Sequence, residues 1–313
     1  MPNQFAAVLI ASVLCSASAA GLAQPASPPA APGAPPTTVH QLTVIAPPKP
    51  KLIEKQTYTF VKGYAAAPNP EVDQIGRWHD PVCVKVLGLP QADQAAVIKA
   101  RIESVARAVG LPAARAGCRA NVEIVFSDEP QRIMDIVARL REVLLGYYHL
   151  HDRDRLKQVT HPIQSWYVTE TEGDPFGLGP KIVVDDANGR SANGCAGSRI
   201  ATECLESKFK NVFIVADNKA LEGKDVGLVA DYMVMLALSQ PSSLEGCNAL
   251  PSVIELFAKS ACPGRDADGL TPADAAYLTA LYAADLSQRK PVERVDIAHR
   301  MAKILIQANS GGG

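Results

Sequence analysis

The hydrophobic pattern of this chain is most extreme over residues 226–240. Apolar side chains occupy most positions there, and Asp231 is the one charged residue. A helix that is apolar on all sides is buried, and a helix of this length is too short to cross a bilayer. Asp225 precedes the stretch in the place of an N-cap, and Pro241 follows it. The pattern therefore predicts a central buried helix.

Helical spacing recurs elsewhere in the chain. Apolar residues fall three or four positions apart over residues 94–109 and 131–145, which predicts amphipathic helices. Thr271, followed by a proline and by Asp274, forms a helix start signal, and Pro291 opens another helix. We therefore expect the last part of the chain to be helical.

Alternating or continuous apolar runs predict the strands. These runs cover residues 57–64, 121–126, 163–171, 180–184 and 211–215. Strands that alternate with helices, followed by helices alone, indicate an α+β (α/β-like) fold with a mixed twisted sheet and packing helices. We expect one globular domain over residues 51–308, with the sheet in residues 51–225 and a helical portion over residues 226–308.

The two ends of the chain are expected to lie outside this domain. Residues 1–23 combine a short apolar run with small residues, which is typical of a secretory signal. Residues 24–50 are rich in Pro and Ala and predict a disordered linker, and residues 309–313 predict a disordered tail. No later segment is apolar for long enough to span a membrane. The prediction is an exported protein, either periplasmic or secreted.

The overall charge argues against two kinds of partner. The chain has 31 Lys and Arg residues against 32 Asp and Glu residues. Such a balance gives no basic excess to recruit nucleic acid or anionic lipid.

Cysteine usage is more informative. Of the 7 cysteines, one lies in the leader, and an even number in the exported chain predicts disulfides. We prefer the sequential pairing because each bond then closes a modest loop, although six cysteines allow 15 connectivities. The preferred pairs are Cys83–Cys118, Cys195–Cys204 and Cys247–Cys262. A cysteine zinc site is disfavoured because no Cys-x-x-Cys pair is present.

The segments around the buried helix resemble zinc peptidases of the zincin group, of the matrixin type. Zincins place HExxHxxGL on a buried helix, then SIM-like residues, then a short helix containing LTxxD…LY. Here residues 250–254 are LPSVI and residues 270–282 are LTPADAAYLTALY. The resemblance covers about the C-terminal third of the chain. Where the family has His, Glu and His, this chain has Asp231, Tyr232 and Met235.

These substitutions remove the chemistry that the resemblance would imply. Catalytic zinc needs about three protein ligands, and a thioether such as that of Met235 is a poor ligand for zinc. Tyr232 supplies no carboxylate base. We therefore predict no catalytic residue, no metal and no cofactor, and the sequence favours a non-enzyme. As a lone buried acid, Asp231 is expected to be paired or neutralised.

The resemblance then implies a pseudo-peptidase that binds a peptide or protein partner. An extended peptide can add to an exposed sheet edge. The strands over residues 163–171 and 211–215, which carry Trp166, Tyr167 and Phe213, are the candidates for that edge.

Two alternatives stay open. The first is a secreted hydrolase whose metal ligands have moved to His149, His151 and His161, which lie close together in the sequence. The second is an exported structural domain that is unrelated to zincins.

Overall fold

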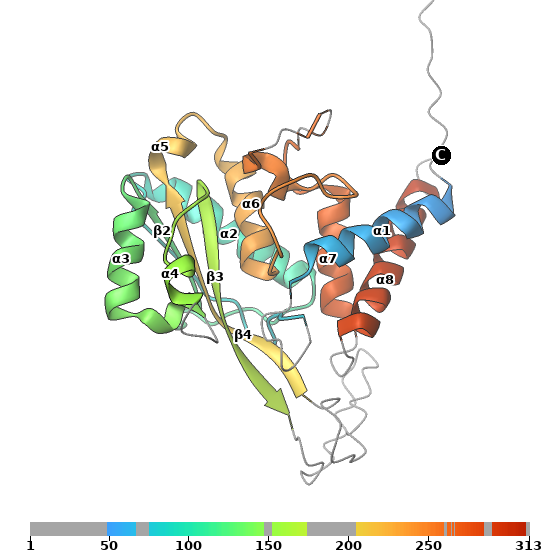
Figure 1. Ribbon diagram of the computed structural model, residues 1–313, viewed down its shortest axis with the longest axis horizontal. Coiled ribbons are helices and arrows are strands. Elements are labelled where there is room, and N and C mark those ends of the chain that lie inside the picture. Colours follow the sequence, from blue (N-terminus) through green and yellow to red (C-terminus); the bar gives the residue numbers. More distant parts are fainter. Residues whose placement is uncertain are drawn as a thin grey trace, which may run out of the picture. The chain divides into compact units, whose positions relative to one another are not determined.

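The sheet and most of the expected helices are present. The computed structural model describes residues 49–66, 75–146, 152–173, 205–259, 262, 263, 265, 267–284 and 290–310. All of them belong to one compact unit, Pro47–Gly313. Within these ranges the chain combines helices with a four-stranded mixed sheet, which confirms the α+β class (Figure 1).

The described elements follow the chain in an alternating order that ends in helices. They are α1 (Pro50–Tyr64), β1 (Val84–Leu87), α2 (Ala92–Ala108), β2 (Val122–Ser127), α3 (Pro130–Leu140), η1 (Glu142–Leu145), α4 (Arg153–Leu156), β3 (Ile163–Gly173), β4 (Leu205–Asp217), α5 (Asn218–Leu221), α6 (Val226–Leu238), η4 (Val253–Phe257), α7 (Pro272–Ala283) and α8 (Lys290–Ser310).

The strand order of the sheet is β1-β2-β4-β3. β1, β2 and β4 run parallel, and β3 runs antiparallel to β4. The helix α2 lies between β1 and β2 in the chain, as a crossover between parallel strands requires. Within the described residues, β1 and β3 therefore form the two edges of the sheet.

Each face of the sheet packs against its own helices because side chains alternate along a strand. On one face α2 and α6 cover the main core, which includes Val212 and Ile214 (Figure 1). On the other face α3 and η1 cover a smaller core, which includes Trp166 and Phe213. Beyond α6, the helices α1, α7 and α8 pack together and complete the helical portion.

The buried helix α6 ends among side chains that satisfy its last carbonyl groups. The last four C=O groups of a helix have no partner within it, and residues 229–238 are all buried here. Donors from separate parts of the chain supply the missing hydrogen bonds: Tyr167 Oη to the carbonyls of Leu236 (2.9 Å) and Ser239 (3.0 Å), Trp78 Nε1 to that of Ala237 (2.7 Å), and Tyr282 Oη to that of Leu238 (2.7 Å). This end of α6 therefore fixes the positions of β3 and α7.

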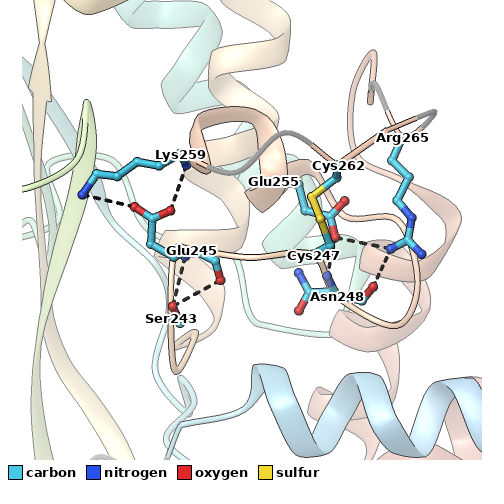
Figure 2. The surroundings of a disulfide bond; sticks show 8 residues. All are labelled: Ser243, Glu245, Cys247, Asn248, Glu255, Lys259, Cys262 and Arg265. Carbon is cyan, nitrogen blue, oxygen red and sulfur yellow. Dashed lines mark hydrogen bonds and ion pairs between the residues drawn. A yellow bond between two sulfur atoms is a disulfide. The ribbon is translucent and has the colours of Figure 1, made fainter.

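Two disulfides lie in the described ranges, and they are the pairs expected from the sequence. Cys83–Cys118 joins the start of β1 to the loop before β2. Cys247–Cys262 closes the loop that carries η4, beside the Glu255 and Arg265 side chains (Figure 2). The expected Cys195–Cys204 bond lies outside the described residues, as do the predicted leader and the strand over residues 180–184.

Two segments differ from the prediction. Residues 57–64 form the last turns of α1 instead of a strand. The buried positions Ile53, Thr57, Phe60 and Tyr64 recur with a helical period, and Pro50 occupies the first turn, where proline suits a helix. The strand β1 was not predicted, since four residues show too little alternation.

Candidate functional site

Asp231 is held by partners on two sides. Its Oδ1 lies 2.5 Å from Nε of Arg101 on α2, and its Oδ2 accepts a hydrogen bond of 2.9 Å from the Leu270 amide. The whole residue is 8% exposed. These contacts meet the expectation that a buried acid is paired, and they give Asp231 a structural role.

Tyr232 and Met235 are fully buried. The Tyr232 ring packs edge-on against Phe257, with 4.9 Å between ring centroids. Its hydroxyl has no hydrogen-bond partner in the described part of the chain, and burial raises the pKa of Tyr232. Met235 belongs to the main core. The side chains of Tyr232 and Met235 are therefore not accessible to a substrate or a metal ion from solvent.

The zincin-like segments that follow α6 are joined through Asp274. One oxygen of its carboxylate accepts from Ser252 Oγ at 2.6 Å, and the other accepts from the Val253 amide at 2.8 Å. Thr271 completes a capping box with Asp274 at the start of α7, which confirms the predicted start signal. Burial raises the pKa of Asp274, although these donors oppose the increase.

Of the three histidines considered as relocated ligands, His161 alone falls in the described ranges. Its Nε2 lies 2.8 Å from Glu245 Oε1, and its Nδ1 lies 2.9 Å from Thr160 Oγ1. The Lys259 backbone amide, followed by His161, lowers the pKa of Glu245, and Figure 2 shows Lys259 reaching this carboxylate. Among the residues that the structure describes, no group of three His, Cys, Asp or Glu side chains is arranged to hold a metal ion.

The expectation of an exposed peptide-binding edge fails for residues 211–215. They belong to β4, which pairs with β2 on one side and with β3 on the other. Trp166 is 2% exposed and Phe213 is 3% exposed, because both fill the smaller core. The Tyr167 hydroxyl is engaged at the end of α6. These three aromatic side chains therefore contribute to the folded structure, and those of Trp166 and Phe213 are not available to a peptide. Of the two candidate strands, β3 lies at an edge of the described sheet and β4 does not.

The backbone of β3 can be oriented from its register. The Asp217 amide donates to the Pro162 carbonyl at 2.8 Å, so these opposed residues occupy a hydrogen-bonded position of the ladder, although Pro162 has no N–H to donate in return. Pairs alternate in an antiparallel ladder between hydrogen-bonded and non-hydrogen-bonded. Ser165, three positions after Pro162, therefore directs its N–H and C=O away from β4. No hydrogen-bond partner for either group is found among the described residues.

These outward groups of Ser165 lie at a groove of about 410 Å³. Its lining includes residues 164–167 of β3 and the segment 240–244 that follows α6. Arg155 and His161 are the ionisable side chains that line it besides Tyr167, and both have acidic partners, Asp152 and Glu245. The groove therefore offers backbone groups and mostly uncharged side chains, which suit a peptide main chain.

Gly146, which also lines the groove, lies directly against β3. A Cβ added to Gly146 would lie 1.7 Å from the Tyr167 carbonyl oxygen, and its φ of +62° is in the left-handed region. Only glycine adopts both that approach and that φ without strain. Gly146 therefore packs directly against the Tyr167 carbonyl, two residues beyond Ser165.

A second cleft, of about 850 Å³, lies beyond the carboxyl ends of β1, β2 and β4. Ligands of open parallel sheets commonly bind at such a position. Its exposed charged side chains carry both signs, as in Lys219, Lys224, Asp128 and Glu222, so they favour no particular ligand. The sequence did not reveal this cleft because β1 was not predicted.

Comparison with protein-family models, with curated proteins and with solved structures gives no match to this chain. None of the helices in the described ranges has the length and apolar character that a bilayer crossing requires. Function is therefore inferred from the chemistry of the described residues.

Proposed function

We propose that this chain is a non-catalytic, zincin-like domain that binds an extended peptide along the outer edge of β3. The observation that carries the proposal is the outward backbone of Ser165, which has no hydrogen-bond partner among the described residues and lies at a groove with mostly uncharged walls. A bound peptide would continue the sheet by pairing with these groups, in the mode of strand addition.

The zincin-like part of the proposal draws support from contacts among the resembling segments. The mixed sheet precedes the buried helix in the chain, as in zincins. The LPSVI segment is joined to the LTPAD segment through Ser252 and Asp274, and the latter segment is joined to α6 through Leu270 and Asp231. The segments that resemble zincins are thus connected to one another by hydrogen bonds. At the positions of the catalytic residues, Asp231 forms an ion pair, and Tyr232 and Met235 pack in the core.

The peptide-binding part draws support from the contrast between two neighbouring residues. Trp166 forms a hydrogen-bonded pair with Phe213 in the ladder, whereas Ser165 points its backbone outward. An unpaired edge of this kind is a template for another strand. The walls of the groove would confine a partner to a single extended chain.

The test is a selection for linear peptides from a random phage-displayed library, followed by affinity measurements on two variants. Ser165→Pro removes the outward N–H but no ladder hydrogen bond, since proline is tolerated on the solvent side of an edge strand. We expect Ser165→Pro to weaken binding about tenfold or more, which corresponds to roughly one lost hydrogen bond with added steric hindrance. Ser165→Ala keeps the N–H and serves as the matched control, with near-normal affinity.

The proposal fails if no peptide is enriched, or if both variants bind as tightly as the parent. The non-catalytic part has a separate readout, because a selected peptide should remain intact after prolonged incubation with the protein. Cleavage that depends on zinc, and that is lost when His149, His151 and His161 are changed, would instead support the hydrolase.

A further inference from the structure

A third cleft lies at the opposite edge of the sheet from the groove. It has a volume of about 670 Å³ and is lined by parts of β1, α2 and the loop 114–120. Its lining includes cationic side chains from all three segments: Lys85, Lys99, Arg115 and Arg119. The carboxylates in the lining are Glu103 and Glu123. Cations therefore outnumber carboxylates in this cleft, although the whole chain is nearly neutral.

The two carboxylates are already engaged. Glu123 forms a bidentate ion pair with Arg141, with both N···O distances 3.0 Å, and this contact lowers the pKa of Glu123. Glu103 lies 3.7 Å from Lys99, one helical turn away on α2. The negative charge of the cleft is therefore largely offset by cations.

Three further cations form no ion pair or side-chain hydrogen bond with a described residue: the exposed side chains of Lys85, Arg115 and Arg119. Lys85 lies opposite Glu123 in the β1–β2 ladder, and its charge helps to lower the pKa of Glu123. Like charges that gather around a concave surface raise the local concentration of an opposite charge. Two arginines can each present a planar fork of donors to a phosphate group.

The fold brings these cations together through a covalent link. Lys85 lies two residues after Cys83, and Arg119 follows Cys118, so the disulfide joins the strand to the arginine loop. Between the two arginines, the Cys118 amide donates to the Arg115 carbonyl at 3.1 Å, and Gly117 has a φ of +73°. This turn reverses the chain, so that both arginines line the same cleft.

We propose that this cleft binds the phosphate group of a ligand through Lys85, Arg115 and Arg119. The phosphate belongs either to a small soluble molecule or to a lipid headgroup. The site is independent of the peptide groove, since the two clefts share no lining residue.

Isothermal calorimetry with pyrophosphate tests the soluble source. Flotation with phosphatidylglycerol vesicles, compared with phosphatidylcholine vesicles, tests the lipid source. At least one probe should bind the full chain, with an affinity that falls as salt increases. The variant with Lys85→Gln, Arg115→Gln and Arg119→Gln should weaken this binding at least about tenfold.

A control variant removes equal charge from an exposed surface elsewhere: Lys51→Gln, Lys55→Gln and Lys62→Gln on α1. It should bind as the parent protein does. All six positions are exposed, so both variants should fold, and circular dichroism can verify this. The proposal is overturned if neither probe binds, or if binding falls equally in the two variants.

Discussion

The two edges of the sheet expose different chemistry. At the β3 edge, the Ser165 backbone faces a groove whose ionisable side chains His161 and Arg155 have acidic partners. At the β1 edge, Lys85 and two arginines that form no ion pair with any described residue line a cleft instead. One edge suits a peptide main chain and the other suits an anion. The net charge of −1 does not reveal this difference between the edges, because a ligand responds to the charges close to its binding site.

The edges also differ in how they are held. The β1 edge is joined to its neighbouring loop by the Cys83–Cys118 disulfide. The β3 edge is held by noncovalent contacts, which include the Tyr167 hydroxyl at the end of α6 and the close approach of Gly146. Perturbations of the two edges should therefore be separable, and each of the following changes tests that separation.

Removing the disulfide should have the largest effect. Replacing Cys83 and Cys118 by Ala releases a loop with a sequence separation of 35, which should reduce the free energy of unfolding by about 3 to 4 kcal/mol. Urea denaturation measures this loss. Phosphate binding should weaken because the arginine loop is freed, whereas peptide affinity at the β3 edge should persist. Unchanged phosphate affinity would show that the disulfide does not position the cations.

A pair of glycine substitutions compares the two edges directly. Gly146→Ala combines a positive φ with a clash against the Tyr167 carbonyl, whereas Gly117→Ala has a positive φ and open space around its Cβ. We expect a loss of about 3 kcal/mol for Gly146→Ala and about 1 kcal/mol for Gly117→Ala. Equal losses in thermal or urea denaturation would contradict the close approach at the β3 edge.

Tyr167→Phe should have a smaller effect. The change removes a donor to the Leu236 and Ser239 carbonyls at the buried end of α6. Leaving such acceptors without a partner costs about 1 to 2 kcal/mol. Phosphate binding should be unaffected, and a weakened phosphate site would show that the two edges are coupled.

The smallest effect on stability is expected from Arg141→Gln. Arg141 lowers the pKa of Glu123 in the folded state, so the pair contributes stability above pH 4.5 that is lost as pH falls through the folded pKa. Since Arg141 is exposed, that contribution is about 0.5 kcal/mol, and it should disappear in the variant. Glu123 would then repel an anion, so phosphate affinity should fall several-fold. An unchanged affinity would show that Glu123 does not face the bound anion.

The sequence predicted those parts of the fold that depend on local chemistry. The N-cap Asp225, the capping box of Thr271 and Asp274, and the uninterrupted apolar run of α6 each form as expected. Residues 57–64 were predicted as a strand because their apolar and polar side chains alternate. The helical period becomes visible only when the preceding residues of α1, such as Ile53, are included.

The candidate sites depended on information that a single sequence does not carry. The strand over residues 163–171 was predicted, but Ser165 can be identified as a candidate binding residue only because β4 lies on one known side of β3. The same register buries Trp166 and Phe213, which were expected to contact a partner. The cationic cleft joins residues of separate segments, and the predicted Cys83–Cys118 bond, with a sequence separation of 35, was the one sign of their proximity.

Strand addition at β3 is tested most directly by hydrogen exchange at the Ser165 amide, measured by NMR with and without a selected peptide. A peptide that pairs with β3 should slow this exchange about tenfold or more at saturation, while the Trp166 amide, which already lies within the ladder, should change little. A peptide that binds tightly and leaves Ser165 exchange unchanged would contradict strand addition at β3.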